Sequence, residues 1–260
     1  MIFTWRINKV IRFATKTHEI YQKQKRKGKD IPYITHPLAV GLMLALTGAK
    51  EEVVAAGILH DTIEDSIPEK KVTKQMLAER FGENVAALVE SVSELRKDLP
   101  WEVRKREALE RIKSFSHESL LVKSADIISN ASEIIDDHRR DGDAVFERFK
   151  ASKEQWLKHY LRTISAVIQR WPENPLADDL RDVGRDLQST GALQFMPRHP
   201  AKIIEYADYD ENHLLECPVC GWQGSPKESG WIEYHDDLLD VSCPNCEKML
   251  LVVSYPLVAK

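Results

Sequence analysis

The first 216 residues of this chain of 260 residues contain no cysteine, so disulfide bonds cannot hold this part of the chain together. The chain has four cysteines, and all of them lie close to its end, at Cys217, Cys220, Cys243 and Cys246. Such clustering indicates one local site rather than a fold that disulfide bonds stabilise.

The sequence also lacks a long hydrophobic run and an excess of basic residues. The longest weakly polar run, residues 37–49, is too short to cross a bilayer, and Arg6 and Lys9 interrupt any signal-peptide core. The 37 basic and 41 acidic residues leave a net charge of −4, so no global basic excess points to nucleic acid. Because 43% of the residues are hydrophobic, wholesale disorder is excluded. We expect a soluble, cytoplasmic protein.

The charge is distributed unevenly along the chain. Residues 206–260 carry ten acidic and three basic residues, a net charge of −7, whereas residues 1–205 carry a net charge of +3. We expect a mainly α protein with an all-helical domain over residues 1–172, a linker with a possible helix over 173–205, and a small β-rich module over 206–260.

Apolar residues recur at helical spacing along the first part of the chain. The pattern predicts a helix over about 51–61, another over about 119–138, and one continuous helix over about 143–171. In the last part, WIEYH (231–235), LLDVS (238–242) and MLLVVSY (249–255) are typical of strands.

Two histidines and two aspartates are candidate metal ligands: His36, the adjacent pair His60 and Asp61, and Asp126. Mixed nitrogen and oxygen donors suit Mn, Fe, Ni or Zn better than Ca or Mg. A lone His-Asp pair more commonly reflects chance or helix-end chemistry, so the neighbouring residues have to decide.

The residues after the His-Asp pair strengthen the metal interpretation. Glu64 follows His60 by four residues and Asp65 follows Asp61 by four, so a continuing helix would place each pair on one face. Gathering so many acidic groups is costly unless a cation offsets their repulsion. Lys123, Asp126 and Asn130 likewise share one face of the predicted helix over 119–138, for which a solvated surface is the alternative.

These residues lie in stretches that resemble the HD superfamily of metal phosphohydrolases. Within it, the sequence is most similar to the hydrolase domain of RelA/SpoT homologues, especially the small alarmone hydrolases of the metazoan type. The resemblance covers roughly residues 5–170 and is carried by RKGKDIPYITHPLAV (26–40), GILHDTIEDS (57–66), FGENVAALVESVSEL (81–95), LPWEVRKREALERI (99–112) and LVKSADIISNASEI (121–134).

The resemblance implies an enzyme that uses a divalent ion, usually Mn²⁺, to remove the 3′-diphosphate of (p)ppGpp, giving GDP or GTP and pyrophosphate. It implies catalytic roles for Glu64 and Asp65. The implied metal ligands are His36, His60, Asp61 and Asp126, and the candidate substrate contacts are Arg26, Lys27, Lys123 and Asn130.

Two departures from the family pattern keep alternatives open. Ser124 replaces a leucine and Ile127 replaces a basic residue in the last motif. The substrate could therefore be another nucleotide, such as an adenine alarmone or a phosphorylated dinucleotide cofactor. A nucleotide-sensing regulatory protein whose C-terminal module recruits a partner is a further alternative, although a pure sensor would not need Glu64 and Asp65.

The cysteines form two Cys-x2-Cys motifs, CPVCGW (217–222) and CPNCEK (243–248), separated by 22 residues. Paired motifs of this kind are a strong signal for zinc, and redox disulfides are the alternative. The sequence predicts a zinc ribbon with a structural Zn²⁺ held by Cys217, Cys220, Cys243 and Cys246. Its net charge of −7 makes nucleic acid an unlikely ligand, which leaves a protein partner or a second copy of the chain.

Overall fold

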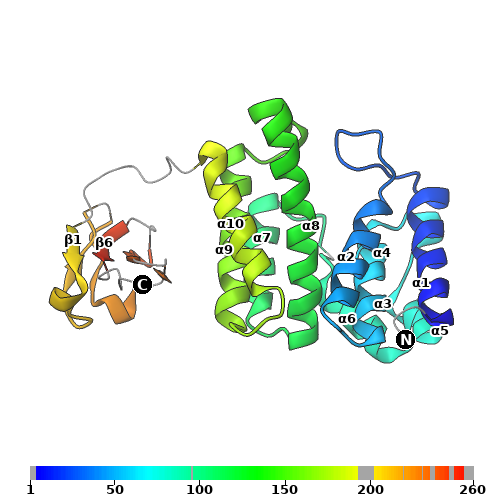
Figure 1. Ribbon diagram of the computed structural model, residues 1–260, viewed down its shortest axis with the longest axis horizontal. Coiled ribbons are helices and arrows are strands. Elements are labelled where there is room, and N and C mark those ends of the chain that lie inside the picture. The colour runs from blue at the N-terminus through cyan, green and yellow to red at the C-terminus, as the bar shows by residue number, and fades with distance from the viewer. Residues whose placement is uncertain are drawn as a thin grey trace. The chain divides into compact units, whose positions relative to one another are not determined.

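The computed structural model describes residues 4–94, 96–192, 202–218, 220–229, 231–234, 238–245 and 249–254. The chain divides into two units, Met1–Leu193 and Gln194–Lys260. The first is helical, and the second is a small β region with clustered cysteines, as predicted (Figure 1). In the described part of the chain, no helix is both long enough and apolar enough to span a membrane.

The helical unit begins with α1 (Trp5–Thr15), which Thr4 caps by accepting a hydrogen bond from the Ile7 N–H. The chain continues directly into a π-helix, η1 (Lys16–Tyr21). The helices α2 (Thr35–Leu46) and α3 (Glu51–Leu59) then pack against each other very closely. A Cβ atom on Gly57 would lie 2.2 Å from Leu44 Cδ1, so only glycine allows this approach.

The predicted helix over 51–61 is shorter than expected. The helix α3 ends at Leu59, and a single helical turn, α4 (Thr62–Asp65), follows after His60 and Asp61. The break places the His-Asp pair at a junction between two helices instead of inside one.

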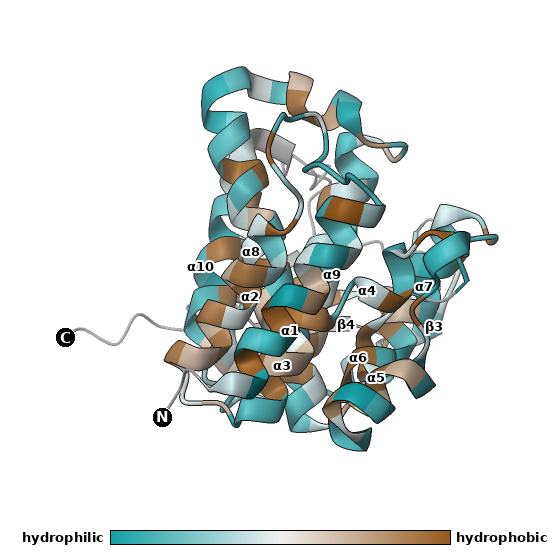
Figure 2. Cartoon of the chain, turned by 90° about the vertical axis from the view of Figure 1, so that its right-hand side faces the viewer, coloured by the Kyte–Doolittle hydropathy of each residue, from teal (hydrophilic) through white to brown (hydrophobic). Residues whose placement is uncertain are grey.

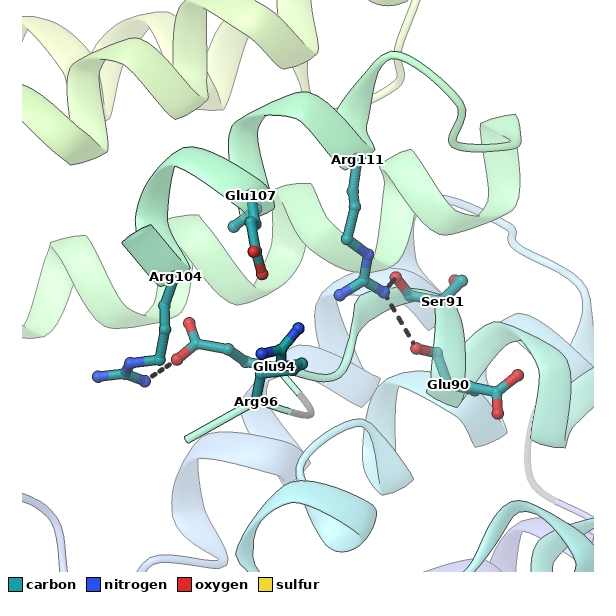
Figure 3. Close-up of a pocket in the computed structure, with 8 residues that line it drawn as sticks. Glu90, Ser91, Glu94, Arg96, Arg104, Glu107 and Arg111 are labelled. Carbon is teal, nitrogen blue, oxygen red and sulfur yellow. Dashed lines mark hydrogen bonds and ion pairs between the residues drawn. The ribbon is translucent and has the colours of Figure 1, made fainter. Parts of the chain in front are cut away.

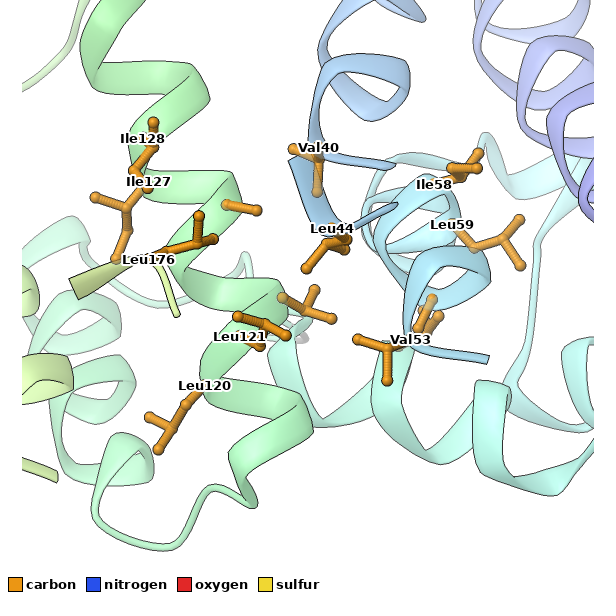
Figure 4. Close-up of a cluster of buried hydrophobic side chains, with 14 of the residues drawn as sticks. Val40, Leu44, Val53, Ile58, Leu59, Leu120, Leu121, Ile127, Ile128 and Leu176 are labelled. Carbon is orange, nitrogen blue, oxygen red and sulfur yellow. The ribbon is translucent and has the colours of Figure 1, made fainter. Parts of the chain in front are cut away.

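The longest helix, α8 (His117–Asp141), runs through the middle of the unit. It confirms the helix predicted over 119–138 and extends it at both ends. Side chains of α2, α3 and α8 meet in the core (Figure 4), and hydrophobic residues follow these helices in Figure 2. The other elements of this region are η2 (Pro68–Lys70), α5 (Lys74–Phe81), α6 (Glu83–Val92) and α7 (Trp101–Ile112).

The prediction of one continuous helix over 143–171 is wrong. A 3₁₀ helix, η3 (Gly142–Arg148), precedes α9 (Lys153–Arg170). Gly142 ends α8 with φ at 63°, and Ser152 starts α9 with a capping box in which Gln155 takes part. These local hydrogen bonds outweigh the continuous apolar periodicity.

Helix α10 (Ala177–Leu187) lies in the stretch predicted as a linker with a possible helix. It packs on α8 and α9 through buried residues that include Leu180 and Leu187, and the π-helix η4 (Gln188–Ala192) follows it. The proposed domain limits stay a prediction.

The β-rich unit contains a four-stranded sheet in the order β1-β6-β5-β4. The strands β4, β5 and β6 are antiparallel neighbours and confirm the three predicted strands, whereas β1 pairs with β6 in parallel. Leu239, Val241, Leu251 and Val253 form its core. The bounds are β1 (Lys202–Glu205), η5 (Tyr206–Asp208), β2 (Leu215–Glu216), β3 (Gln223–Gly224), η6 (Pro226–Glu228), β4 (Trp231–Tyr234), β5 (Leu238–Ser242) and β6 (Met249–Ser254).

Candidate metal centre and active site

Four predicted ligands converge in the helical unit, and we call them the histidine–aspartate cluster: His36, His60, Asp61 and Asp126. His36 lies in the first turn of α2, His60 and Asp61 lie between α3 and α4, and Asp126 lies on α8. The two His Nε2 atoms are 3.2 Å apart. The close packing of α2 on α3 therefore brings together two imidazoles that are far apart in the sequence.

The spacing of the donor atoms suits a small divalent ion. Asp61 Oδ2 lies 3.0 Å from His60 Nε2 and 3.6 Å from His36 Nε2. Asp126 Oδ1 lies 3.3 Å from His36 Nε2 and 3.6 Å from His60 Nε2. With metal–ligand bonds of about 2.1 Å, neighbouring ligands are about 3.0 Å apart in an octahedral site and about 3.4 Å apart in a tetrahedral one. The donor set therefore fits a transition metal ion.

Hydrogen bonds orient both imidazoles. His60 Nδ1 donates to the Gly57 carbonyl oxygen at 2.7 Å, which leaves the Nε2 lone pair directed at the cluster. Ser129 Oγ lies 2.8 Å from His36 Nδ1. The Tyr33 hydroxyl donates to Asp61 Oδ2 at 2.6 Å. Sequence reasoning missed Ser129 and assigned Tyr33 to packing, because both contacts depend on how distant elements pack.

The charges of the cluster favour a cation at its centre. Burial lowers the pKa of His60, but the Asp61 and Asp126 carboxylates outweigh it and raise this pKa well above its usual value. Burial raises the pKa of Asp126, but Lys123 and the two imidazoles outweigh it and hold this pKa well below its usual value. Two buried carboxylates thus attract a proton to a neighbouring imidazole, and a metal ion can take the place of that proton.

The two proposed catalytic carboxylates both lie on α4, beside the cluster. Glu64 Oε2 accepts a hydrogen bond from the Glu94 N–H at 2.9 Å. Lys97 Nζ donates to Asp65 Oδ1 at 2.6 Å and lies 3.5 Å from Glu64 Oε1, so it bridges the pair. Burial, together with the charges of Asp61 and Asp65, raises the pKa of Glu64 to about 7. A group with this pKa can accept or donate a proton at neutral pH.

Three of the four predicted substrate contacts join the cluster through hydrogen bonds. Lys123 Nζ donates to Asp126 Oδ2 at 2.8 Å, and Asn130 Nδ2 donates to Asp126 Oδ1 at 2.7 Å. Arg26 in turn donates to Asn130 Oδ1 at 2.8 Å. Lys27 instead lies over the Phe149 ring, 4.8 Å from its centroid, so the structure does not bring it to the cluster.

A buried ionic network fixes the basic loop that carries Arg26. Glu133 lies within 2.8 Å of both Arg26 and Lys29, and Asp137 lies 2.7 Å from Lys29. Asp137 is only 2% exposed and also accepts a hydrogen bond from Arg148 at 2.6 Å. The loop is therefore held against α8 and η3, and its Arg26 is already oriented toward the cluster.

A second cationic and aromatic group flanks the site on α7 and α9, and sequence reasoning did not find its α9 members. Burial and the Lys123 charge lower the pKa of Lys105 to about 8. Burial and the charges of Lys105 and Lys123 lower the pKa of His159 to about 3, so this imidazole is neutral. The Trp101 ring lies 5.9 Å from His159, and Tyr160 stacks on Trp156 at 3.9 Å.

A pocket of 380 Å³ lies beside this region, between α6 and α7 (Figure 3). Arg104 and Lys105 both pair with Glu94, which joins the pocket to the Glu64 hydrogen bond. Arg111 donates to the carbonyl oxygen of Ser93 at 2.8 Å and so closes the end of α6. The lining holds three arginines and three glutamates, so its charge does not favour an anion: Glu90, Ser91, Glu94, Arg96, Arg104, Glu107, Ala108 and Arg111.

The two positions that depart from the family motif serve packing. Ile127 is 3% exposed and lies in the core (Figure 4). Ser124 is fully buried, donates to the Leu120 carbonyl oxygen at 2.7 Å and accepts from Asn174 Nδ2 at 2.8 Å. Neither side chain belongs to the histidine–aspartate cluster, so these replacements give no support to a different nucleotide.

Three of the predicted zinc ligands, Cys217, Cys220 and Cys243, lie together in the β-rich unit, and we call them the cysteine cluster. The Sγ atoms of Cys220 and Cys243 are 3.5 Å apart. Gly221, with φ at 72°, closes a turn in which its N–H donates to the Cys217 carbonyl oxygen at 2.9 Å. The donor chemistry suits zinc, and Cys246 lies outside the described residues.

An all-helical unit that gathers two histidines and two aspartates around one point defines a metal-dependent phosphohydrolase of the HD type. The HD domain family model matches residues 11–154, more than half of the chain, and the chain belongs to this family.

Its relatives include known alarmone enzymes. The guanosine-3′,5′-bis(diphosphate) 3′-pyrophosphohydrolase of Aquifex aeolicus is 44% identical over 91 residues, which cover 35% of this chain and 12% of that protein. The guanosine-3′,5′-bis(diphosphate) 3′-pyrophosphohydrolase MESH1 of Danio rerio is 34% identical over 126 residues, which cover 48% of this chain and 66% of that protein. The matches thus span from about a tenth to just under two thirds of these relatives.

Solved structures share the fold. The structure of a metazoan ortholog of SpoT that hydrolyzes ppGpp matches with a TM-score of 0.59 and 23% identity, over 74% of this chain and 98% of that chain. The structure of lmo0812 from Listeria monocytogenes matches with a TM-score of 0.53 and 28% identity, over 59% of this chain and 97% of that chain.

Proposed function

We propose that the helical unit removes the 3′-diphosphate of ppGpp or pppGpp, releasing pyrophosphate and leaving GDP or GTP. The observation that carries the proposal is the arrangement of the histidine–aspartate cluster directly beside Glu64 and Asp65 on α4. Relatives whose names specify this reaction support it.

In this reaction the cluster holds a divalent ion, which we propose to be Mn²⁺ and which supplies a Lewis acid next to the reacting phosphate. Glu64, with its raised pKa, takes the proton of the attacking water. Asp65 accepts a hydrogen bond from the same water and orients it. Lys97 limits the repulsion between these two carboxylates, because its ammonium group lies against both.

The negative charge of the substrate needs several cations. Arg26 offers two parallel N–H donors to a phosphate, and Lys123 offers a point charge from α8. Both are already paired in the structure, Arg26 with Glu133 and Asn130, and Lys123 with Asp126. A phosphate would share these donors. Asn130 holds Arg26 and Asp126 in register, and Lys27 reaches outward from the loop as a further contact.

The test is turnover. The purified chain is incubated with ppGpp and Mn²⁺, with and without a chelator, and the nucleotides are separated by ion exchange. We expect GDP and pyrophosphate only with metal. His60→Ala should lose both the metal and the turnover, and Lys27→Ala should keep the metal and raise KM. No product from a chain that contains its metal would contradict the guanine-alarmone assignment.

For the β-rich unit we propose a structural zinc site made by the cysteine cluster together with Cys246. Elemental analysis should find one zinc ion per chain in addition to the metal of the helical unit. Since four thiolates complete the coordination of Zn²⁺, this site would stabilise the fold and not catalyse a reaction. We further propose that the ribbon contacts a protein partner or a second copy of the chain.

A further inference from the structure

The segment between α1 and α2 carries a chain of two hydrogen bonds that ends on the Asp65 carboxylate. The side-chain amide of Gln24 lies in its middle. Its Nε2 donates to Asp65 Oδ2 at 2.9 Å, and its Oε1 lies 2.9 Å from His18 Nδ1. His18 is 0% exposed. The chain therefore starts at an imidazole without access to solvent and ends on α4, beside the histidine–aspartate cluster.

The chemistry of the three groups fixes the direction of both hydrogen bonds. An ionised carboxylate only accepts, so the amide nitrogen of Gln24 faces Asp65 and its oxygen faces His18. That oxygen also only accepts, so His18 carries its proton on Nδ1 and donates it. In this tautomer Nε2 has only a lone pair, which agrees with its lacking a hydrogen-bond partner among the described residues.

The backbone holds Gln24 in place independently of its side chain. The Gln24 N–H donates to the His18 carbonyl oxygen at 2.9 Å, and the Gln24 carbonyl oxygen accepts from the Tyr33 N–H at 3.0 Å. His18 itself lies in the π-helix η1, a rare conformation that occurs frequently at functional sites. Both residues are therefore fixed before Asp65 approaches, and little conformational freedom is lost when the chain forms.

The other oxygen of the Asp65 carboxylate has a much looser partner. Lys97 donates to Oδ1, but its side chain is 49% exposed and belongs to the segment between α6 and α7. An exposed lysine can turn toward an incoming phosphate, whereas the amide of Gln24 is held from both sides. Gln24 is thus the partner that can keep the carboxylate in one orientation while the substrate binds.

We propose that Gln24 is a positioning residue for hydrolysis, acting through Asp65, and that His18 fixes the orientation of its amide. The inference rests on the proposed function, in which Asp65 orients the attacking water. Without Gln24, the Asp65 carboxylate would rotate, and the water would lose its alignment with the phosphorus atom.

The first experiment compares Gln24→Leu with Gln22→Leu. Leucine keeps the approximate size of glutamine and removes its hydrogen bonds. Gln22 is a matched control because it lies in the same segment and its Nε2 has no hydrogen-bond partner in the described structure. For Gln24→Leu we expect kcat to fall about tenfold to hundredfold, with KM and metal content unchanged. Gln22→Leu should change kcat less than about twofold.

A double-mutant comparison separates positioning from a merely structural role. In an Asp65→Asn background, Gln24→Leu should lower kcat no further, because both variants remove one and the same alignment. A loss of equal size in both backgrounds would overturn the proposal. The His18 variants form a matched pair: His18→Phe removes the donor and should lower kcat, and His18→Asn places an amide N–H near the position of Nδ1 and should restore most of it.

Two further measurements separate this proposal from the alarmone assignment. The kinetics are repeated with bis(p-nitrophenyl) phosphate, a diester that needs the metal centre but no nucleotide recognition. Turnover of the diester alone would remove ppGpp as the substrate while still testing Gln24. If neither probe is turned over, both proposals fail. The ¹⁵N spectrum of the His18 ring tests the chain without any substrate: a proton on Nδ1 is expected, and a proton on Nε2 would overturn the proposed direction.

Discussion

The histidine–aspartate cluster and the cysteine cluster differ in how the chain assembles them. The first draws its donors from α2, the junction between α3 and α4, and α8, over a span of residues 36–126. The second draws its donors from short turns beside the strands of the β-rich unit. The first site therefore needs the whole helical core in place, whereas the second can form locally around its ion.

The difference teaches which way stability flows in each unit. In the helical unit a large core, centred on α8, creates the site and any metal adds to it. In the β-rich unit the described core contains only a few buried aliphatic side chains. A core of that size gives little stabilisation, so the metal is expected to supply much of it.

The strongest way to break this comparison is to remove the zinc ligands. Cys217→Ser with Cys243→Ser should abolish the folded state of the β-rich unit, because structural zinc contributes about 10 kcal/mol or more in small zinc domains. Hydrogen exchange should show loss of protection in β5 and β6, and unchanged protection in α8. Equal protection of β5 in the variant and in the parent chain would contradict a structural role.

The second test concerns chemistry at the open site. Glu64→Gln should keep the divalent metal and the melting temperature of the helical unit, but lower kcat about 100-fold to 10,000-fold, since it removes a general base. The control is Glu69→Gln, a charge change on the exposed η2 nearby. Turnover within a few-fold of the parent chain would exclude Glu64 as the base.

The third test sharpens the contrast by pH. Because burial raises the pKa of Glu64 to about 7, the carboxylate needed to take a proton is lost below that pH. We expect kcat to rise by about tenfold per unit up to about pH 7 and then to level off. Metal content is measured at each pH, because protonation of the histidine ligands would also lower turnover. A profile that is flat from pH 5 to 9 at full metal content would rule the prediction out.

The smallest expected effect is on packing beneath the helical site. Gly57→Ala would place a Cβ atom 2.2 Å from Leu44 Cδ1 and should destabilise the unit by about 1–3 kcal/mol. Gly184→Ala on α10 is the matched control, since its Cβ atom would meet only Ile164, at 3.8 Å, and alanine favours a helix. Thermal unfolding should therefore move in opposite directions for the two variants, and equal shifts would disprove the close approach.

Much of the helical site could be predicted because each ligand lies in a short, specific motif. The hydrogen-bond partners could not, since Tyr33, Ser129 and Lys97 reach the site only through the packing of distant elements. The same limit applies to Gln24, whose contact with Asp65 spans 41 positions of the chain.

The error over residues 143–171 has a different origin. The apolar stripe continues through the break, and the sequence SKEQ at 152–155 is a capping-box pattern that could have revealed the start of α9. For α10 the pattern predicted a helix, but its packing on α8 and α9 depends on tertiary contacts. Local signals thus fix helix ends, whereas membership of a core requires the three-dimensional structure.

The π-helix η1 has a consequence for insertions and deletions. A π-turn accommodates about one residue more than an α-helical turn, so deleting a single residue from Lys16–Tyr21 would let α1 continue as an ordinary α-helix. Because each α-helical residue turns the chain by about 100°, His18 would then leave the interior and the loop with Arg26 would start from another face. Length changes at the end of α1 should therefore be tolerated far less than their distance from the metal ligands in the sequence suggests.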